Sequence, residues 1–149
     1  MSPQALYDVH FMFKDIHKVV IEFAQSLDED QLYWKPKGYS TSIGFHLWHL
    51  ARESDFLKAV ILERTPQLGA DFGEAKEIWA REELAQKWGF PTELNATVGT
   101  GLSDEAASTL PIPPINELMD YLCRSYSALE QFVELLDERY PNFDSVDEE

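Results

Sequence analysis

The side chains of this chain best suited to metal or proton chemistry are its histidines, which stand in two pairs. His10 and His17 are seven residues apart, and His46 and His49 are three apart. Each pair therefore falls on one side of its segment if that segment is helical. Glu53 follows His49 by four residues and adds a carboxylate to the second pair. Because imidazole nitrogens and carboxylate oxygens suit divalent zinc, nickel or iron, this second group is a candidate metal site.

The same residues also have an interpretation without a ligand role. Histidines at the edge of an amphipathic helix commonly pack against its core, and a glutamate on a helix face is most often solvated. At about 100° per residue, His46 and His49 splay by roughly 60° around a helix. The spacing leaves both interpretations open.

Other kinds of catalytic site are not indicated. Cys123 is the single cysteine, so no intrachain disulfide can form, and its place in an apolar helical pattern predicts a buried, inert thiol. The run from Gly99 to Gly101 lacks the Lys-Ser pair and the preceding strand of a phosphate-binding loop, so we expect a turn. The four tryptophans are expected to pack rather than line a pocket.

Three stretches have apolar residues at steps of three and four, the period of a core-facing helix. In the first stretch the expected core positions are Leu6, Val9, Phe13, Ile16, Val20, Phe23 and Leu27. In the second stretch they are Ile43, Leu47, Leu50, Ser54, Leu57 and Ile61, after a cap at Ser40, Thr41 or Ser42. In the third stretch they are Ile115, Leu118, Leu122, Ser125, Leu129, Phe132 and Leu136.

The segments between these stretches are shorter and less regular. Pro36 and Gly38 predict a turn over residues 31–39, and Pro66 is expected to stop the second long helix. A shorter helix is expected over 74–88, closed by a glycine, and a long connection over 92–114 with one helical turn at 103–108. The sequence thus predicts an all-α bundle of three long helices and one short helix.

Length and charge restrict the class of protein further. The chain has 149 residues with 12 Lys and Arg against 27 Asp and Glu, a formal net charge of −15. We expect one domain over residues 1–140 and an acidic tail over 141–149. The charge argues against nucleic acid and against an anionic membrane surface as partners. Without an apolar run of membrane-spanning length or a basic leader, the chain is expected to be cytoplasmic.

Five segments, taken in their order, are particular enough to suggest a family. They are 26–32 (SLDEDQL), 34–36 (WKP), 41–52 (TSIGFHLWHLAR), 86–91 (QKWGFP) and 99–105 (GTGLSDE). The chain resembles the DinB-like superfamily of metalloenzymes over nearly its whole length. The resemblance implies a bundle of four long helices, usually dimeric, with zinc or nickel held by three histidines.

The resemblance also implies where those histidines belong. One comes from the second helix and falls on His49, and two come from an HxxxH pair on the last helix. His46 stands where the family commonly has an apolar or aromatic residue, and it could act with Glu53 as a substitute ligand. No histidine follows Tyr140, so the last family helix and its two ligands are missing from this sequence.

Two functions and one further possibility follow from the resemblance. The first is a metal-dependent enzyme, a thiol-dependent transferase or isomerase or a hydrolase, that acts on a small-molecule thiol substrate. The alternative is a non-catalytic helical-bundle homodimer with a structural or interaction role, because three wide apolar faces ordinarily need a fourth partner helix. The chain could also be a truncated product of a longer protein that continues with the histidine helix.

Overall fold

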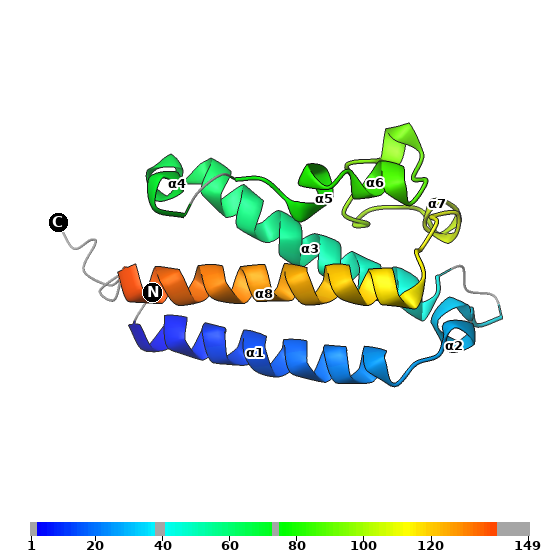
Figure 1. Cartoon of the computed structure of the whole chain (residues 1–149), viewed down its shortest axis with the longest axis horizontal. Coiled ribbons are helices and arrows are strands. Elements are labelled where there is room, and N and C mark those ends of the chain that lie inside the picture. The colour runs from blue at the N-terminus through cyan, green and yellow to red at the C-terminus, as the bar shows by residue number, and fades with distance from the viewer. Residues whose placement is uncertain (1–2, 38–40, 73–74, 140–149) are drawn as a thin grey trace.

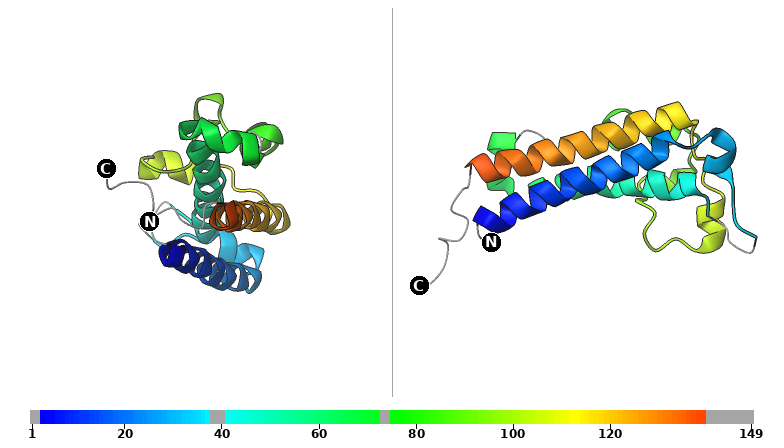
Figure 2. Two further views of the ribbon diagram at one scale, coloured as in Figure 1. Left: turned by 90° about the vertical axis from the view of Figure 1, so that its left-hand side faces the viewer. Right: turned by 90° about the horizontal axis from the view of Figure 1, so that it is seen from below.

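Three long helices form the body of the protein (Figure 1). They are α1 (Pro3–Gln25), α3 (Ile43–Arg64) and α8 (Ile115–Arg139). This computed structural model describes residues 3–37, 41–72 and 75–139, without the side chains of residues 3–8, 70 and 71. Helix α8 packs against both α3 and α1, and all elements in these ranges are helical (Figures 1 and 2). The expected all-α fold with three long helices is confirmed.

Short helices connect the long ones. They are α2 (Glu29–Tyr33), α4 (Pro66–Phe72), α5 (Ile78–Arg81), α6 (Leu84–Lys87), the 3-10 helix η1 (Thr92–Leu94) and α7 (Asp104–Ser108). Helices α5 and α6 lie on the side of α3 that faces away from α1 (Figures 1 and 2). None of the helices found in the described ranges is long and apolar enough to cross a membrane.

Several expected boundaries are confirmed by their capping contacts. The Ser42 side chain accepts a hydrogen bond from the Phe45 amide at the start of α3. The predicted helical turn at 103–108 is α7, where the Ser103 side chain accepts from the Ala106 amide. A side-chain oxygen that caps these otherwise unpaired amides explains why each helix begins where it does.

The prediction of a single short helix over residues 74–88 is wrong. The segment is divided into α5 and α6, because Glu83 between them has a left-handed backbone with φ of 52°. The 31–39 stretch, where Pro36 and Gly38 favour a turn, begins inside α2, whose start is fixed by a capping box between Asp28 and Gln31. Pro66 does follow the end of α3, yet it also opens α4, where a proline in the first turn loses no helical hydrogen bond.

The predicted core positions of α8 are largely confirmed, but those of α1 and α3 are only partly buried. Ile16 and Phe23 are about half exposed, at 52% and 49%, and Leu50 and Leu57 are exposed at 40% and 39%. The reason is that α8 covers one side of α1 and of α3, while these four residues lie on sides that the described segments leave partly open. Amphipathic period shows that a face is apolar but not whether a partner covers it.

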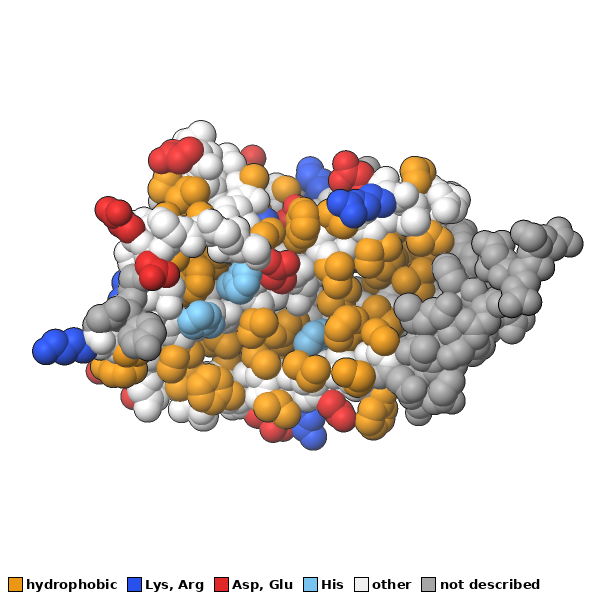
Figure 3. Space-filling view, turned by 180° about the vertical axis from the view of Figure 1, so that it is seen from behind, with side chains coloured by type: hydrophobic (Ala, Val, Ile, Leu, Met, Phe, Trp, Pro, Cys, Tyr) orange, Lys and Arg blue, Asp and Glu red, His pale blue; other side chains and the backbone are white. Residues whose placement is uncertain are grey.

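We call this uncovered surface the open face. It consists of exposed apolar residues on two helices, namely Met12, Ile16, Val19 and Phe23 of α1 with Leu50 and Leu57 of α3. Figure 3 shows hydrophobic side chains gathered over this side of the molecule, with histidines among them. The wide apolar helix faces expected from the sequence thus include a surface that no described segment fully covers.

Candidate functional site

His49 is held in one tautomer by the loop that follows η1. Its Nδ1 lies 2.6 Å from the carbonyl oxygen of Val98. A carbonyl can only accept a hydrogen bond, so Nδ1 must carry the proton and donate it. In the neutral ring this leaves the lone pair on Nε2, the arrangement usual for histidine ligands of metals. The ring also stacks on Phe45, with centroids 6.1 Å apart, and the side chain is 29% exposed.

Glu53 stands one helical turn beyond His49, on the same side of α3. Its Oε1 lies 4.0 Å from His49 Nε2, too far for a direct hydrogen bond, and accepts a hydrogen bond from the Thr100 hydroxyl. A zinc ion bound about 2.1 Å from each of two donors fits between atoms about 3–4 Å apart. The two side chains predicted together are thus brought together, and Thr100 is a contact that the spacing did not reveal.

Gly99 allows the loop to approach His49 so closely. Its φ is +102°, and a Cβ atom built there would lie 2.7 Å from His49 Nδ1 and 3.0 Å from the Trp48 ring. Any other residue would therefore push the loop away from the imidazole. The expected turn at 99–101 is confirmed, but its contact with His49 was missed, although two glycines so close together were a signal of unusual backbone.

Replacing Gly99 with alanine is expected to disturb the site, and Gly101 provides a matched control. Both glycines have positive φ, but a Cβ at Gly101 has nothing within 4 Å. Gly101→Ala should cost only the conformational strain, on the order of 1–2 kcal/mol. Gly99→Ala adds the collision with His49. Urea unfolding should therefore show a clearly larger loss of unfolding free energy for Gly99→Ala than for Gly101→Ala. Equal losses in the two variants would contradict the packing described here.

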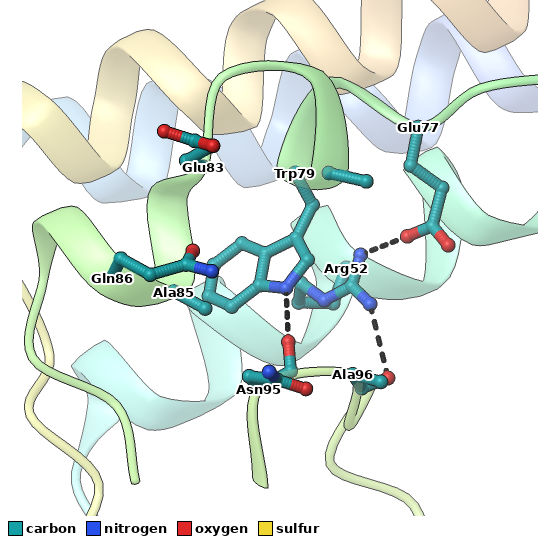
Figure 4. Close-up of a pocket in the computed structure, with 9 residues that line it drawn as sticks. Arg52, Glu77, Trp79, Glu83, Ala85, Gln86, Asn95 and Ala96 are labelled. Atoms are coloured by element: carbon teal, nitrogen blue, oxygen red, sulfur yellow. Dashed lines mark hydrogen bonds and ion pairs between the residues drawn. The ribbon is translucent and has the colours of Figure 1, made fainter. Parts of the chain in front are cut away.

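Arg52 fixes the same loop from inside the protein (Figure 4). Its side chain is 1% exposed, and its guanidinium donates to the carbonyl oxygens of Thr97 and Ala96 and to the Glu77 carboxylate. The guanidinium carbon also lies 4.6 Å from the centre of the Trp79 ring. Because Arg52 is three residues after His49, one turn of α3 carries both the candidate ligand and the anchor of its loop.

Asp55 completes this buried network and joins three helices. Its two oxygens accept hydrogen bonds from the Ile78 and Trp79 amides at the start of α5, each at 2.9 Å, and from the Tyr121 hydroxyl of α8. Burial, together with the charge of Asp55, raises the pKa of Tyr121 far above its ordinary value. Tyr121 therefore stays protonated and acts as a donor. Neither Arg52 nor Asp55 was recognised from the sequence as a structural centre.

A pocket of about 260 Å³ lies beside this network, in the view of Figure 4. It is lined by Arg52, Glu77, Trp79, Ala80, Glu83, Ala85, Gln86, Asn95 and Ala96. Several polar groups that line it are bonded to one another, since Arg52 pairs with Glu77 and the Trp79 indole donates to the Asn95 carbonyl oxygen. We therefore assign this pocket to the framework that holds the loop, and place the candidate site at His49.

The other histidines do not join His49. His46 is exposed, and its Nε2 lies 3.4 Å from the Thr41 hydroxyl. His17 is buried, with its Nδ1 2.7 Å from a Glu130 carboxylate oxygen and its ring stacked on Tyr126. His17 thus links α1 to α8 and has a packing role. His10 is half-buried on α1.

The remaining candidate residues behave largely as expected. Cys123 is half-buried rather than buried, and burial raises the pKa of its thiol, so the reactive thiolate is disfavoured. Trp48 and Trp79 are buried in the core, which agrees with a packing role, although Trp79 also lines the pocket beside Arg52. Trp34 is 60% exposed. The predicted acidic tail lies outside the described residues.

The donors near His49 are too few for a catalytic metal centre of the usual kind. Catalytic zinc normally has three protein ligands, and this cluster provides at most two, His49 and Glu53. Within the described ranges, no group of three or more histidine, cysteine or acidic side chains could hold a metal ion. The residues described here therefore fit part of a metal shell, and a complete one needs donors from elsewhere.

The arrangement is that of an all-α bundle with one oriented histidine on its second long helix. The family model of the DinB superfamily matches residues 12–145, so the chain belongs to the DinB superfamily. None of the curated proteins is significantly similar to the chain. The family resemblance seen in the sequence is thereby confirmed.

Proposed function

We propose that this chain is a metal-binding protein of the DinB superfamily in which His49 binds a divalent zinc or nickel ion through Nε2. Glu53 is the second proposed ligand, and the remaining donors come from outside the described residues. The reaction class we propose is that of a thiol-dependent transferase or isomerase, or a hydrolase, acting on a small-molecule thiol substrate. Since the shell is incomplete, we derive no reaction step through the metal.

One observation carries this proposal, the fixed tautomer of His49. In the neutral ring, the bond from Nδ1 to Val98 leaves the lone pair on Nε2, beside the Glu53 carboxylate. In histidine ligands of metals, the ring nitrogen that does not bind the metal almost always donates to a carboxylate, a backbone carbonyl or water, and Val98 supplies such a carbonyl here. Three neighbours support it, since Gly99, Arg52 and Thr100 all hold the loop against this ring or its partner.

Native mass spectrometry tests the proposal directly. Purified protein is measured alone and after addition of zinc or nickel, which reports chain number and bound metal together. We expect one metal ion per chain, and its loss on treatment with a chelator. A chain that stays metal-free at a large excess of both ions would contradict the proposal.

A second candidate function is favoured by the open face. Exposed apolar surface of this kind usually marks a site of protein–protein contact, so a non-catalytic bundle with an interaction role is the alternative. The homodimer expected from the sequence is one form of such contact. The same mass spectra test it, because a metal-free dimer would favour the alternative over the metal centre.

A further inference from the structure

A second pocket, of about 250 Å³, lies where α2 and α7 stand beside the start of α3, at one end of the bundle (Figures 1 and 2). Two hydrogen bonds join its walls. The Tyr33 hydroxyl donates to the Pro113 carbonyl oxygen at 2.7 Å, and Lys35 Nζ donates to the Ser108 carbonyl oxygen at 3.1 Å. Most of its lining is apolar and comes from Tyr33, Phe45, Ala107, Leu110 and Ile112. We call it the α2–α7 pocket, and its volume suits a ligand smaller than a typical drug.

The charge of the α2–α7 pocket is opposite to that of the chain. The chain has a formal net charge of −15, yet none of the described residues that line this pocket is acidic, and one of them is Lys35. The sequence explains the difference. Residues 31–45 contain two lysines and no acidic residue, and residues 106–116 contain no charged residue. The two stretches that form the pocket therefore carry a positive charge between them.

Acidic residues do stand on both short helices beside the pocket. Glu29 and Asp30 are in the first turn of α2, and Asp104 and Glu105 are in the first turn of α7. Glu29 acts on Tyr33, because burial and then the charge of Glu29 raise the pKa of that hydroxyl. None of the four acidic residues lines the pocket, so a ligand inside it has a lysine and no carboxylate beside it.

The polar groups of the pocket are hydrogen-bond donors with capacity to spare. Ser42 is 5% exposed, and its oxygen accepts from the Phe45 amide, but its O–H has no acceptor among the described residues. A buried donor without an acceptor costs free energy. The Lys35 ammonium has three N–H groups and gives one of them to Ser108. Ser42 is also the N-cap of the 22-residue helix α3, and a helix N-terminus favours negative charge.

We propose that the α2–α7 pocket binds a small monocarboxylate with an apolar body. The carboxylate oxygens accept hydrogen bonds from the Ser42 hydroxyl and the Lys35 ammonium, beside the start of α3. Such charge-assisted bonds are about twice as strong as bonds between neutral groups. The apolar body lies against Phe45 and Leu110. A cationic ligand would instead stand beside a lysine without a carboxylate to pair with. The inference does not depend on the metal proposed at His49.

Titration of the full, metal-free chain with benzoate tests the inference. Benzoate carries a carboxylate on an apolar ring, benzamide is its neutral counterpart, benzylamine is a cationic one, and acetate lacks the ring. In about 0.15 M salt, benzoate should change the NMR amide shifts to saturation in the millimolar range, mainly at Ser42, Phe45, Ala107 and Leu110. The three comparison compounds should bind at least about ten-fold more weakly.

Ser42→Asp and Ser103→Asp form a first matched pair of variants. Both serines are helix N-caps, and Asp caps a helix as well as Ser does, so both variants should keep the wild-type circular dichroism spectrum. Ser42→Asp adds a negative charge inside the pocket and should weaken benzoate binding at least about ten-fold. Ser103 does not line the pocket, so Ser103→Asp should change the affinity less than about two-fold.

Lys35→Met and Lys37→Met form a second matched pair. Both lysines are exposed, and each variant removes one positive charge from the same stretch of chain. Lys35→Met should weaken benzoate binding about five-fold, the size expected for a charge pair that solvent reaches. Lys37 does not line the pocket, so Lys37→Met should bind benzoate as the wild type does.

Several outcomes would overturn the inference. Equal affinity for benzoate and benzamide would mean that the carboxylate is not recognised, and equal losses within either matched pair would mean that the ligand lies elsewhere. Shifts centred on His49 and Glu53, or no saturation up to about 20 mM benzoate, would also contradict it. Because no metal is added, failure of benzoate binding would leave the proposed metal site intact.

Discussion

Arg52→Met is expected to lower the free energy of unfolding by about 3–5 kcal/mol, the cost typical of removing one partner from a buried ion pair. The methionine keeps much of the side-chain volume but leaves the buried Asp55 and the Glu77 carboxylate without their cation. It also removes the donors to the Thr97 and Ala96 carbonyl oxygens. Because small domains are stable by only about 5–15 kcal/mol, urea unfolding should show a large shift of the midpoint.

Arg124→Met is the matched control for this prediction. Arg124 also pairs with carboxylates, binding both oxygens of Glu82 and contacting Asp120, but its side chain is 38% exposed. Solvent screening limits such surface pairs to roughly 1 kcal/mol or less. If the two variants lose similar stability, Arg52 does not have the central position assigned to it.

The second large effect is expected from His49→Ala, which should weaken zinc or nickel binding by at least about 100-fold. Loss of a direct ligand should exceed the 10–100-fold typical of losing an outer partner. Since the ring is 29% exposed and lies beside a surface loop, helical content should remain close to that of the wild type. Calorimetric titration of the metal ion into both proteins measures the difference.

His46→Ala is the control that shows whether the loss of metal binding is specific to His49 or follows the removal of any histidine. His46 is exposed and contacts Thr41 rather than Glu53, so its removal should change metal affinity little. If metal affinity fell strongly in His46→Ala but stayed unchanged in His49→Ala, the metal ligand would be His46 and not His49. Unchanged affinity in both variants would place the metal elsewhere.

Much of the fold could be predicted from local signals in the sequence. The three long helices followed from apolar period, the start of α3 from the three possible cap residues at 40–42, and the turn at 99–101 from its glycines. These features depend on interactions between residues that are close in the sequence, so the spacing of residue types is enough to predict them. The family resemblance then pointed to His49, because the motif around it is continuous in the chain.

The features that were not predicted depend on contacts between segments far apart in the sequence, and the spacing of residue types within one segment does not indicate such contacts. The carbonyl of Val98 reaches His49 only because Gly99 and Arg52 bring a loop 49 residues away against α3. Period likewise could not show that α8 covers one apolar row of α1 and leaves the row at Ile16 uncovered. In the middle of the chain, the left-handed backbone at Glu83 replaced one expected helix with two.

The most direct test of the account is nitrogen NMR of the histidine rings during zinc titration. We predict that Nδ1 of His49 carries a proton in the metal-free protein, as the bond to Val98 requires. On addition of zinc, the Nε2 resonance of His49 should shift strongly while those of His10, His17 and His46 change little. A His49 ring with its proton on Nε2, or one unaffected by zinc, would contradict the central claim that His49 is a metal ligand.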